Sequence, residues 1–428
     1  MKPTVVFYST LCSLIFAFPA YAIPTDTIEP EDEQDQEMDF PDEPYYPPEE
    51  EEDDEPLPLS ERIGYNDGFF IRNADNTFSL FFNGMLQGRF IYSQAQSVPE
   101  PENENYYRFE LRRTDLYFTG HFIDESWTYV LGTEAGPDGT FAADDVYIAK
   151  AFTENTWGQV GQFSTPFLRE TLISSTRQLT VERSLVSKYF STNNSTGILY
   201  GAENDSVKWE AAATNGYFAH DSYPDETDEN QDVVDHNFQN GQSYSFITRL
   251  EFKPLGEWEE FRGFNSFGEN DMGLLIGVAG AYQRDNDNAD IEEASATIDV
   301  SFQGSGWSTF AMGAVTQDLE NDAGSSYGAQ IQGGLFVDED LDTVELFSRY
   351  EWGNSGSHED FIYPENDDLS ILTAGANYYI YPRHLKLSAD FGYAFTAIGG
   401  NWANTTDGWR TSNTSGQYVG RAQLQLVI

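Results

Sequence analysis

Cysteine is almost absent from this sequence. The single cysteine, Cys12, lies in an apolar stretch from Val5 to Phe18 that follows Lys2 and precedes Ala20-Tyr21-Ala22. A basic residue, an apolar stretch and an A-x-A site, in this order, are typical of a secretory signal peptide. We therefore expect residues 1–22 to be removed and the mature chain to begin at Ile23, without cysteine. Disulfides, thiol catalysis and cysteine metal sites are then excluded.

Long hydrophobic runs are also missing. A transmembrane helix needs roughly 18 or more consecutive apolar residues, and no segment reaches that length. The stretch from Val5 to Phe18 is too short to span a bilayer comfortably, so an uncleaved helix is the less favoured interpretation of it.

Basic residues are scarce. The chain holds 22 Lys and Arg against 72 Asp and Glu, which gives a net charge of −50 at pH 7. Nucleic acid and acidic membrane surfaces are therefore not expected as partners, because both are themselves negatively charged. The imbalance is steepest between Asp26 and Glu61, where there are 18 acidic residues and no basic residue.

A long alternating pattern ends the sequence. From Tyr418 to Ile428, one set of alternate residues is mostly apolar, and the other set carries Arg421, Gln423 and Gln425. Alternation with period two over this length predicts a strand with one apolar face and one polar face. A long unpaired strand at a terminus invites aggregation, whereas a closed transmembrane barrel pairs its last strand with its first. The ending therefore favours a barrel.

Sixteen strand-like stretches follow one another from Gly64 onward. They lie near residues 78–92, 106–122, 127–134, 144–152, 157–164, 197–202, 207–217, 243–252, 272–284, 291–303, 307–317, 327–337, 343–353, 370–381, 385–395 and 417–428. The connections alternate between short and long, as in outer-membrane barrels, which have short periplasmic turns and long outer loops. One connection, 253–271, is long where a short one is due.

We therefore predict an all-β fold over residues 64–428, a transmembrane antiparallel β-barrel of about sixteen strands. It would lie in the bacterial outer membrane, in contact with lipid and lipopolysaccharide. A soluble all-β repeat or propeller is the alternative, but its loops need not alternate in length. Sixteen strands make a barrel wide enough for a water-filled lumen, whereas the interior of an eight-stranded barrel is filled by side chains.

The acidic stretch forms a region of its own, which we place at residues 23–63. Its charges repel one another and it has too few apolar residues to bury a core, so we predict a disordered periplasmic segment. A solvated spacer is the favoured role. A Ca²⁺ buffer, a contact with a basic partner and a flexible pore blocker stay open as alternatives.

The predicted strand at 106–122 is the richest in charged residues. Between Arg112 and Thr114, the alternating apolar residues shift by one position, which predicts a β-bulge. Either phase leaves Arg108 and one or both of Arg112 and Arg113 facing the lumen. The inward assignment follows because a charge that faces lipid costs about 2–4 kcal/mol near the midplane of the bilayer.

The connection 165–196 is the second candidate site. It holds two glutamates and twice as many basic residues, which are Arg169, Arg177, Arg183 and Lys188. Its apolar residues indicate a loop that packs rather than one that extends into solvent. Folded into the lumen, such a constriction loop would narrow the pore and set its electric field. The alternative is a surface loop with incidental basic residues.

Several segments resemble one family of outer-membrane channels. They are GQFSTPFLRETLISSTRQLTVERS (161–184), FELRRTDLYFTGHF (109–122), LTAGANYYIYPRHLKLSADFGYAF (372–395), RAQLQLVI (421–428) and GYNDGFFIRNADNTFSLFFNGMLQGRF (64–90). In these segments the chain resembles the phosphate-selective porin O and P family. The resemblance implies a sixteen-stranded pore, commonly a homotrimer, that passes small anions such as phosphate.

In that family, a ladder of arginines and a lysine-containing constriction attract phosphate. Taken with position, the resemblance makes candidates for the pore and constriction of Arg108, Arg112, Arg113, Arg169, Arg177, Arg183 and Lys188. The chain departs from the family pattern in two ways. Other lumen-facing positions mix signs, as at Glu345 and Arg349, and the chain ends in Ile428 where phenylalanine is usual.

The predicted function is passive diffusion of small hydrophilic solutes, with small anions such as phosphate favoured. A general or cation-tolerant pore and a structural or adhesive outer-membrane barrel are the alternatives. No enzyme, cofactor or metal site is predicted. Of the five histidines only His121 lies inside a predicted strand, and no Ser/His/Asn group of a membrane phospholipase is evident.

Overall fold

A computed structural model describes residues 57–65, 68–95, 105–136, 139–216, 244–285, 291–319, 325–340, 342–356, 366–381 and 384–428. The expected signal peptide (1–22), most of the acidic segment and the expected loop 218–242 lie outside the described residues. Among the helices that the structure describes, none is long and apolar enough to cross a membrane.

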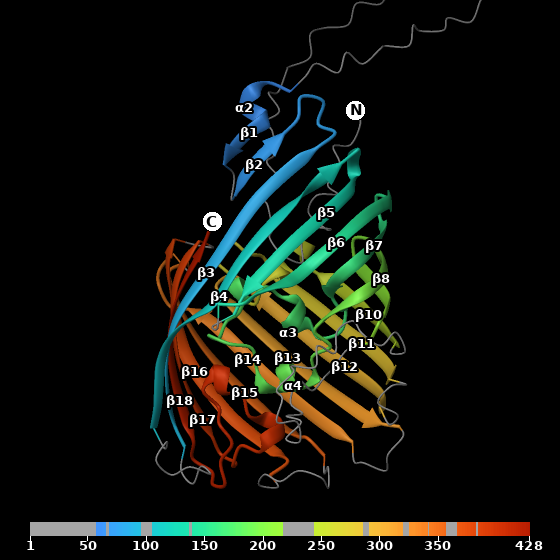
Figure 1. Cartoon of the computed structure of the whole chain (residues 1–428). Coiled ribbons are helices and arrows are strands. Elements are labelled where there is room, and N and C mark those ends of the chain that lie inside the picture. The colour runs from blue at the N-terminus through green and yellow to red at the C-terminus, as the bar shows by residue number, and fades with distance from the viewer. Residues whose placement is uncertain are drawn as a thin grey trace, which may run out of the picture.

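Sixteen antiparallel strands close into a barrel (Figure 1). The strands are β3 (Ser79–Gln94), β4 (Asn105–Phe122), β5 (Asp124–Ala135), β6 (Phe141–Thr153), β7 (Thr156–Ser164), β8 (Asn194–Glu203), β9 (Val207–Thr214), β10 (Tyr244–Leu255), β11 (Gly273–Asp285), β12 (Ile291–Gly304), β13 (Trp307–Asp318), β14 (Ser326–Phe336), β15 (Val344–Asn354), β16 (Asp368–Tyr381), β17 (Leu385–Ala394) and β18 (Tyr418–Val427). Each of the sixteen predicted stretches matches one of these strands. The predicted fold class is confirmed.

The ring closes where the last strand pairs with the first. β18 lies antiparallel to β3, from the pair Tyr418 and Gln94 to the pair Val427 and Met85. The terminal residue continues the ladder, because the backbone groups of Ile428 and Gly84 exchange two hydrogen bonds of 2.8 and 2.9 Å. The last strand therefore has no free edge over this length, which satisfies its backbone groups without water.

The strands present polar residues to the interior and apolar residues to the exterior. In β18, Arg421, Gln423 and Gln425 are buried inside the barrel, whereas Leu424 and Leu426 are exposed on its outer face. This is the reverse of a soluble protein, where the apolar face is buried. It fits a barrel whose outer surface contacts lipid.

A bulge in β4 turns two consecutive arginines toward the lumen. Gln87 of β3 pairs with Arg113 and the next residue, Gly88, pairs with Leu111, so Arg112 is the extra residue. Leu111 points outward and is exposed, whereas the side chains of Arg112 and Arg113 contact a loop inside the barrel. The predicted bulge is confirmed, and both arginines face the lumen.

A small extension precedes the barrel. It consists of α2 (Leu59–Arg62), β1 (Ile63–Tyr65) and β2 (Phe69–Arg72), and β2 pairs with the first residues of β3 beyond the point where β18 ends. In Figure 1 it projects beyond the rim of the barrel. Strands of three and four residues are too short to give a periodic signal, so they are not predictable from the sequence pattern.

Three connections fold into the lumen. The first, between β7 and β8, carries α3 (Arg169–Leu172), η3 (Ser175–Arg177) and α4 (Leu185–Phe190). The second, between β10 and β11, carries η4 (Trp258–Arg262), and the third, between β17 and β18, carries η5 (Gly400–Trp402) and η6 (Thr405–Asp407). The second is the long connection that broke the predicted alternation. Its Phe264 packs 4.6 Å from Phe310, ring centre to ring centre, inside the barrel.

The strand order predicts which connections share an end of the barrel. Cysteines introduced at Asn155, in the β6–β7 turn, and at Thr405, in the β17–β18 connection, should label from opposite sides of an intact outer membrane. Both side chains are exposed, and Cys12 is the single natural cysteine, so the labelling has little background. A membrane-impermeant maleimide should reach Thr405→Cys from outside and Asn155→Cys only after lysis. Labelling of both from outside would contradict the topology.

Candidate functional site

The connection between β7 and β8, here called the inward loop (residues 165–193), crosses the barrel interior and is held from several strands. The backbone oxygen of Phe167 accepts a 2.8 Å hydrogen bond from Arg249 of β10, and that of Leu179 accepts one of 2.9 Å from Asn377 of β16. From β18, Gln425 donates to the backbone oxygen of Thr176 at 3.1 Å. Bonds from opposite parts of the ring fix the loop in place.

The inward loop also has an apolar core, as its composition predicted. Phe167, Leu168 and Val186 are fully buried, and they belong to one cluster with residues of the barrel wall and of the β17–β18 connection. Tyr189 of α4 packs 4.6 Å from Trp402, ring centre to ring centre. The loop is therefore a packed element of the interior and not a surface loop.

A buried ion cluster anchors the start of the inward loop. Besides its bond to Phe167, Arg249 pairs with Asp299 at 2.8 and 3.0 Å and with Glu251 at 2.9 Å. Arg169 lies in the same cluster, where it donates to Ser301 at 2.9 Å and lies 3.6 Å from Glu251. Since each of these arginines is buried and has acidic partners, their charges hold the loop against the wall.

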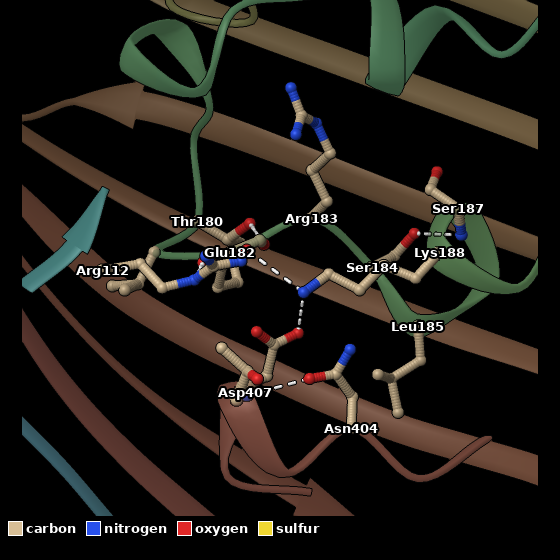
Figure 2. Close-up of polar contacts among 12 residues, drawn as sticks. Arg112, Thr180, Glu182, Arg183, Ser184, Leu185, Ser187, Lys188, Asn404 and Asp407 are labelled. Atoms are coloured by element: carbon tan, nitrogen blue, oxygen red, sulfur yellow. Dashed lines mark hydrogen bonds and ion pairs between the residues drawn. The ribbon is translucent and has the colours of Figure 1, made fainter. Parts of the chain in front are cut away.

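A second ion cluster is centred on Glu182 of the inward loop (Figure 2). One carboxylate oxygen, Oε1, accepts from Nη2 of Arg89 at 2.6 Å, from Nε of Arg112 at 2.7 Å and from Nη1 of Arg113 at 3.0 Å. The other oxygen, Oε2, lies 3.3 Å from Nζ of Lys188. Four cationic groups, from β3, β4 and α4, thus converge on one carboxylate.

Helix α4 places Lys188 between two carboxylates. Ser184 caps the helix, because its hydroxyl oxygen accepts a 2.9 Å hydrogen bond from the backbone N–H of Ser187. One turn later, the ammonium group of Lys188 contacts Glu182 and also Asp407 of the β17–β18 connection (Figure 2). Lys188 therefore joins two of the three inward-folded connections.

The charges of this cluster shift the titration of its loop residues. Burial opposes the ionisation of Glu182, but Arg112, Arg113 and their neighbours outweigh it and hold the pKa of this carboxyl well below its ordinary value. Burial lowers the pKa of Lys188, an effect that Asp407 and Glu182 only partly offset. Glu182 therefore stays ionised in acid in which exposed carboxylates are already protonated.

A cavity of about 470 Å³ lies beside the Glu182 cluster. Its wall side is formed by Arg112 and Arg113 of β4 and Glu134 of β5. Its other sides come from the inward loop and from the β17–β18 connection, with Arg183 and Lys188 among the lining residues. Four of the seven predicted site residues thus line one cavity, the candidate constriction.

The other three predicted residues lie outside this lining. Arg108 pairs with Glu110 at 2.6 Å and donates to the backbone oxygen of Thr406. Arg169 belongs to the anchoring cluster described above. Arg177 is the last residue of η3 in the inward loop, and its backbone oxygen accepts a 3.1 Å hydrogen bond from the backbone N–H of Phe264 of the β10–β11 connection.

Two partners of the constriction, Arg89 and Asp407, are not among the residues predicted from the sequence. Arg89 lies on the inward face of β3, two residues after the buried Gln87. Because alternate residues of a strand share a face, the sequence pattern is sufficient to place Arg89 in the lumen. Asp407 gave no signal, because its role depends on how the β17–β18 connection folds inward. Among the described residues, no group of three or more His, Cys, Asp or Glu is placed to hold a metal ion.

A closed sixteen-stranded barrel with a packed, charged loop in its lumen has the architecture of a porin. Residues 86–246 match the sequence model of the phosphate-selective porin O and P family, which confirms the resemblance seen in the sequence. The matched part includes the inward loop and all seven predicted site residues. Together, the family match and the fold support an outer-membrane channel rather than an enzyme.

Solved porin structures share the fold at low sequence identity. Pseudomonas putida OprB has a TM-score of 0.55 and 8% identity, with 82% of this chain and 94% of that chain covered. An anion-selective porin from Comamonas acidovorans has a TM-score of 0.52 and 9% identity, with 82% and 100% covered. Salmonella typhi OmpF, in a complex with daunomycin, has a TM-score of 0.52 and 14% identity, with 85% and 100% covered. A comparison with curated proteins gave no match.

The anchoring cluster should control how firmly the inward loop is held. Arg249→Met removes the partner of two buried carboxylates, at a cost of about 3–5 kcal/mol for a buried pair that loses one member. We expect noisier single-channel currents. We also expect the folded band on a gel to convert to the heat-denatured band at a lower temperature than in the wild type. Arg284→Met removes a half-exposed partner of Glu292 and serves as the control, because exposed pairs contribute about 0–1 kcal/mol. Equal effects of the two variants would contradict the anchoring role.

Proposed function

We propose that this chain is an outer-membrane porin that passes small hydrophilic solutes by passive diffusion, with a modest preference for small anions such as phosphate. The observation that carries the proposal is the lining of the cavity beside the inward loop. Arg112, Arg113, Arg183 and Lys188 line it, and Glu134 is the one acidic residue of the lining. A mostly basic cavity lining thus lies within a strongly acidic chain.

The electrostatic argument depends on distance. Exposed charges on the outer connections are screened beyond about 8–10 Å at physiological salt. Charges that line a narrow passage act on a solute at contact distance and in a lower local dielectric. The four lining cations should therefore outweigh the more numerous but more distant acidic residues.

A general or cation-tolerant pore is the second candidate, and a specific group of residues favours it. Asp115 of β4 and the neighbouring pair Asp144 and Asp145 of β6 lie on the wall near the cavity, and Glu134 lies between them on β5. Within the barrel these acidic residues oppose the basic lining. The family resemblance also implies a trimer, and we propose a trimeric assembly for either kind of pore.

The reversal potential in a salt gradient decides between the two pores. We expect the wild-type protein in a planar bilayer to be modestly anion-selective at moderate salt and less so at low salt. Replacing Arg183 and Lys188 by glutamine should shift the permeability ratio toward cations by roughly two- to tenfold, or about 0.4–1.4 kcal/mol. Strong cation selectivity of the wild type at moderate salt would replace the anion proposal by the general pore.

A matched control removes the same charge elsewhere. Lys150 and Arg284 lie near opposite rims of the barrel, on β6 and β11, and both side chains are partly exposed. The double variant Lys150→Gln, Arg284→Gln should leave the reversal potential near that of the wild type. A shift as large as that of the constriction variant would mean that total charge, and not the lining, sets selectivity.

Acid should increase the anion preference. Exposed Asp and Glu lose their charge as the pH falls through about 4, so the acidic mouth of the channel is neutralised while the arginines stay charged. Glu182 has a lowered pKa, so its contribution to stability is complete above its ordinary pKa and is lost only as the pH falls through the lowered value. Reversal potentials from pH 7 to about pH 4 should therefore move toward anions without loss of the folded form. Movement toward cations would contradict this.

A further inference from the structure

The Glu182 cluster has the composition of an oxyanion site that already contains its anion. Arg89, Arg112 and Arg113 place guanidinium nitrogens 2.6–3.0 Å from one carboxylate oxygen. Guanidinium and ammonium groups that converge in this way recognise phosphate and carboxylate solutes, through charge-assisted hydrogen bonds. Here the anion at the centre is a side chain of the protein itself.

The cluster gathers more cations around Glu182 than this one carboxylate can neutralise. Four positive groups contact Glu182. Asp407 also contacts Lys188, Glu134 lies 3.6 Å from Arg113, and Glu110 lies 3.9 Å from Nη1 of Arg89. Nη1 of Arg89 is buried and makes no hydrogen bond to the described residues. Glu182 is therefore the one carboxylate that all four cations share, and a buried donor of Arg89 beside it makes no hydrogen bond.

The open side of the cluster faces the cavity. Arg112, Arg113 and Lys188 each contact Glu182, and each also lines the cavity. Glu182 itself is buried behind them, with a side chain that is 1% exposed. A solute anion in the cavity thus meets the same donors that Glu182 already uses.

We propose that Glu182 is a tethered counter-anion that fills an oxyanion site in the constriction and so keeps the channel from binding phosphate tightly. The inference rests on the proposed function. Passing anions contact Arg112 and Lys188 at the edge of the cluster, but the centre is occupied. Without the charge of Glu182, the site would accept inorganic phosphate from the cavity.

The test is block of chloride current by inorganic phosphate. In the variant Glu182→Gln, the phosphate concentration that halves the current should fall at least about tenfold below that of the wild type, with a shift of the reversal potential toward anions. Glu182→Asp keeps the charge and should behave as the wild type does. Glu170→Gln is the matched control, because Glu170 is a buried carboxylate of the same loop that bonds to Ser184 and Gln330 and does not line the cavity.

The outcomes separate this inference from the function on which it rests. Absence of wild-type conductance would refute the channel itself. A conducting, modestly anion-selective wild type with unchanged phosphate block in a folded Glu182→Gln would refute only the role of Glu182. If Glu182→Gln does not fold, Asp407→Asn should give a smaller shift in the same direction, because it frees Lys188. If inorganic phosphate blocks the wild-type channel tightly, this result alone overturns the inference, whatever the variants show.

Discussion

Closure of the barrel is the constraint on which the rest of the structure depends. No water is available in the hydrocarbon core, so each backbone N–H and C=O group there needs a partner within the protein. The pairing of β18 with β3 provides the last of these partners. It also turns one face of every strand inward, where polar side chains gather. The inward loop and its ion clusters exist because this closed ring leaves an interior wide enough to hold them.

Charged side chains inside the barrel form ion pairs within strands and between strands. Arg249 meets Asp299 and Glu251, whereas Arg421 meets Asp390 at 2.8 and 2.9 Å on neighbouring strands. Within each of these pairs the opposite charges cancel. In the lining of the cavity beside Glu182, by contrast, cationic side chains outnumber acidic ones. The field in the lumen is therefore local, and the net charge of −50 describes the whole chain rather than the passage.

The sequence predicted the features that depend on local pattern. Alternation located the sixteen strands, and a phase slip at Arg112 located the bulge, because both are properties of consecutive residues. The composition of 165–196 was enough to predict a packed loop. It did not predict that Arg89, Glu182 and Asp407 belong to one cluster, because their contacts depend on how two connections fold inward. For the same reason the sequence does not explain the length of the connection 253–271, whose Phe264 packs against Phe310 inside the barrel.

The seam between β3 and β18 has a consequence for the order of folding. Gln87 and Gln425, which share a hydrogen bond across it, are 338 residues apart in the chain, whereas the other strand pairs join neighbours in sequence. Closing a loop of that length costs more entropy than any other pairing in the ring. We expect the seam to form last, from a curved sheet with two open edges. Until the carboxyl-terminal strand reaches β3, those edges are free to pair with other chains.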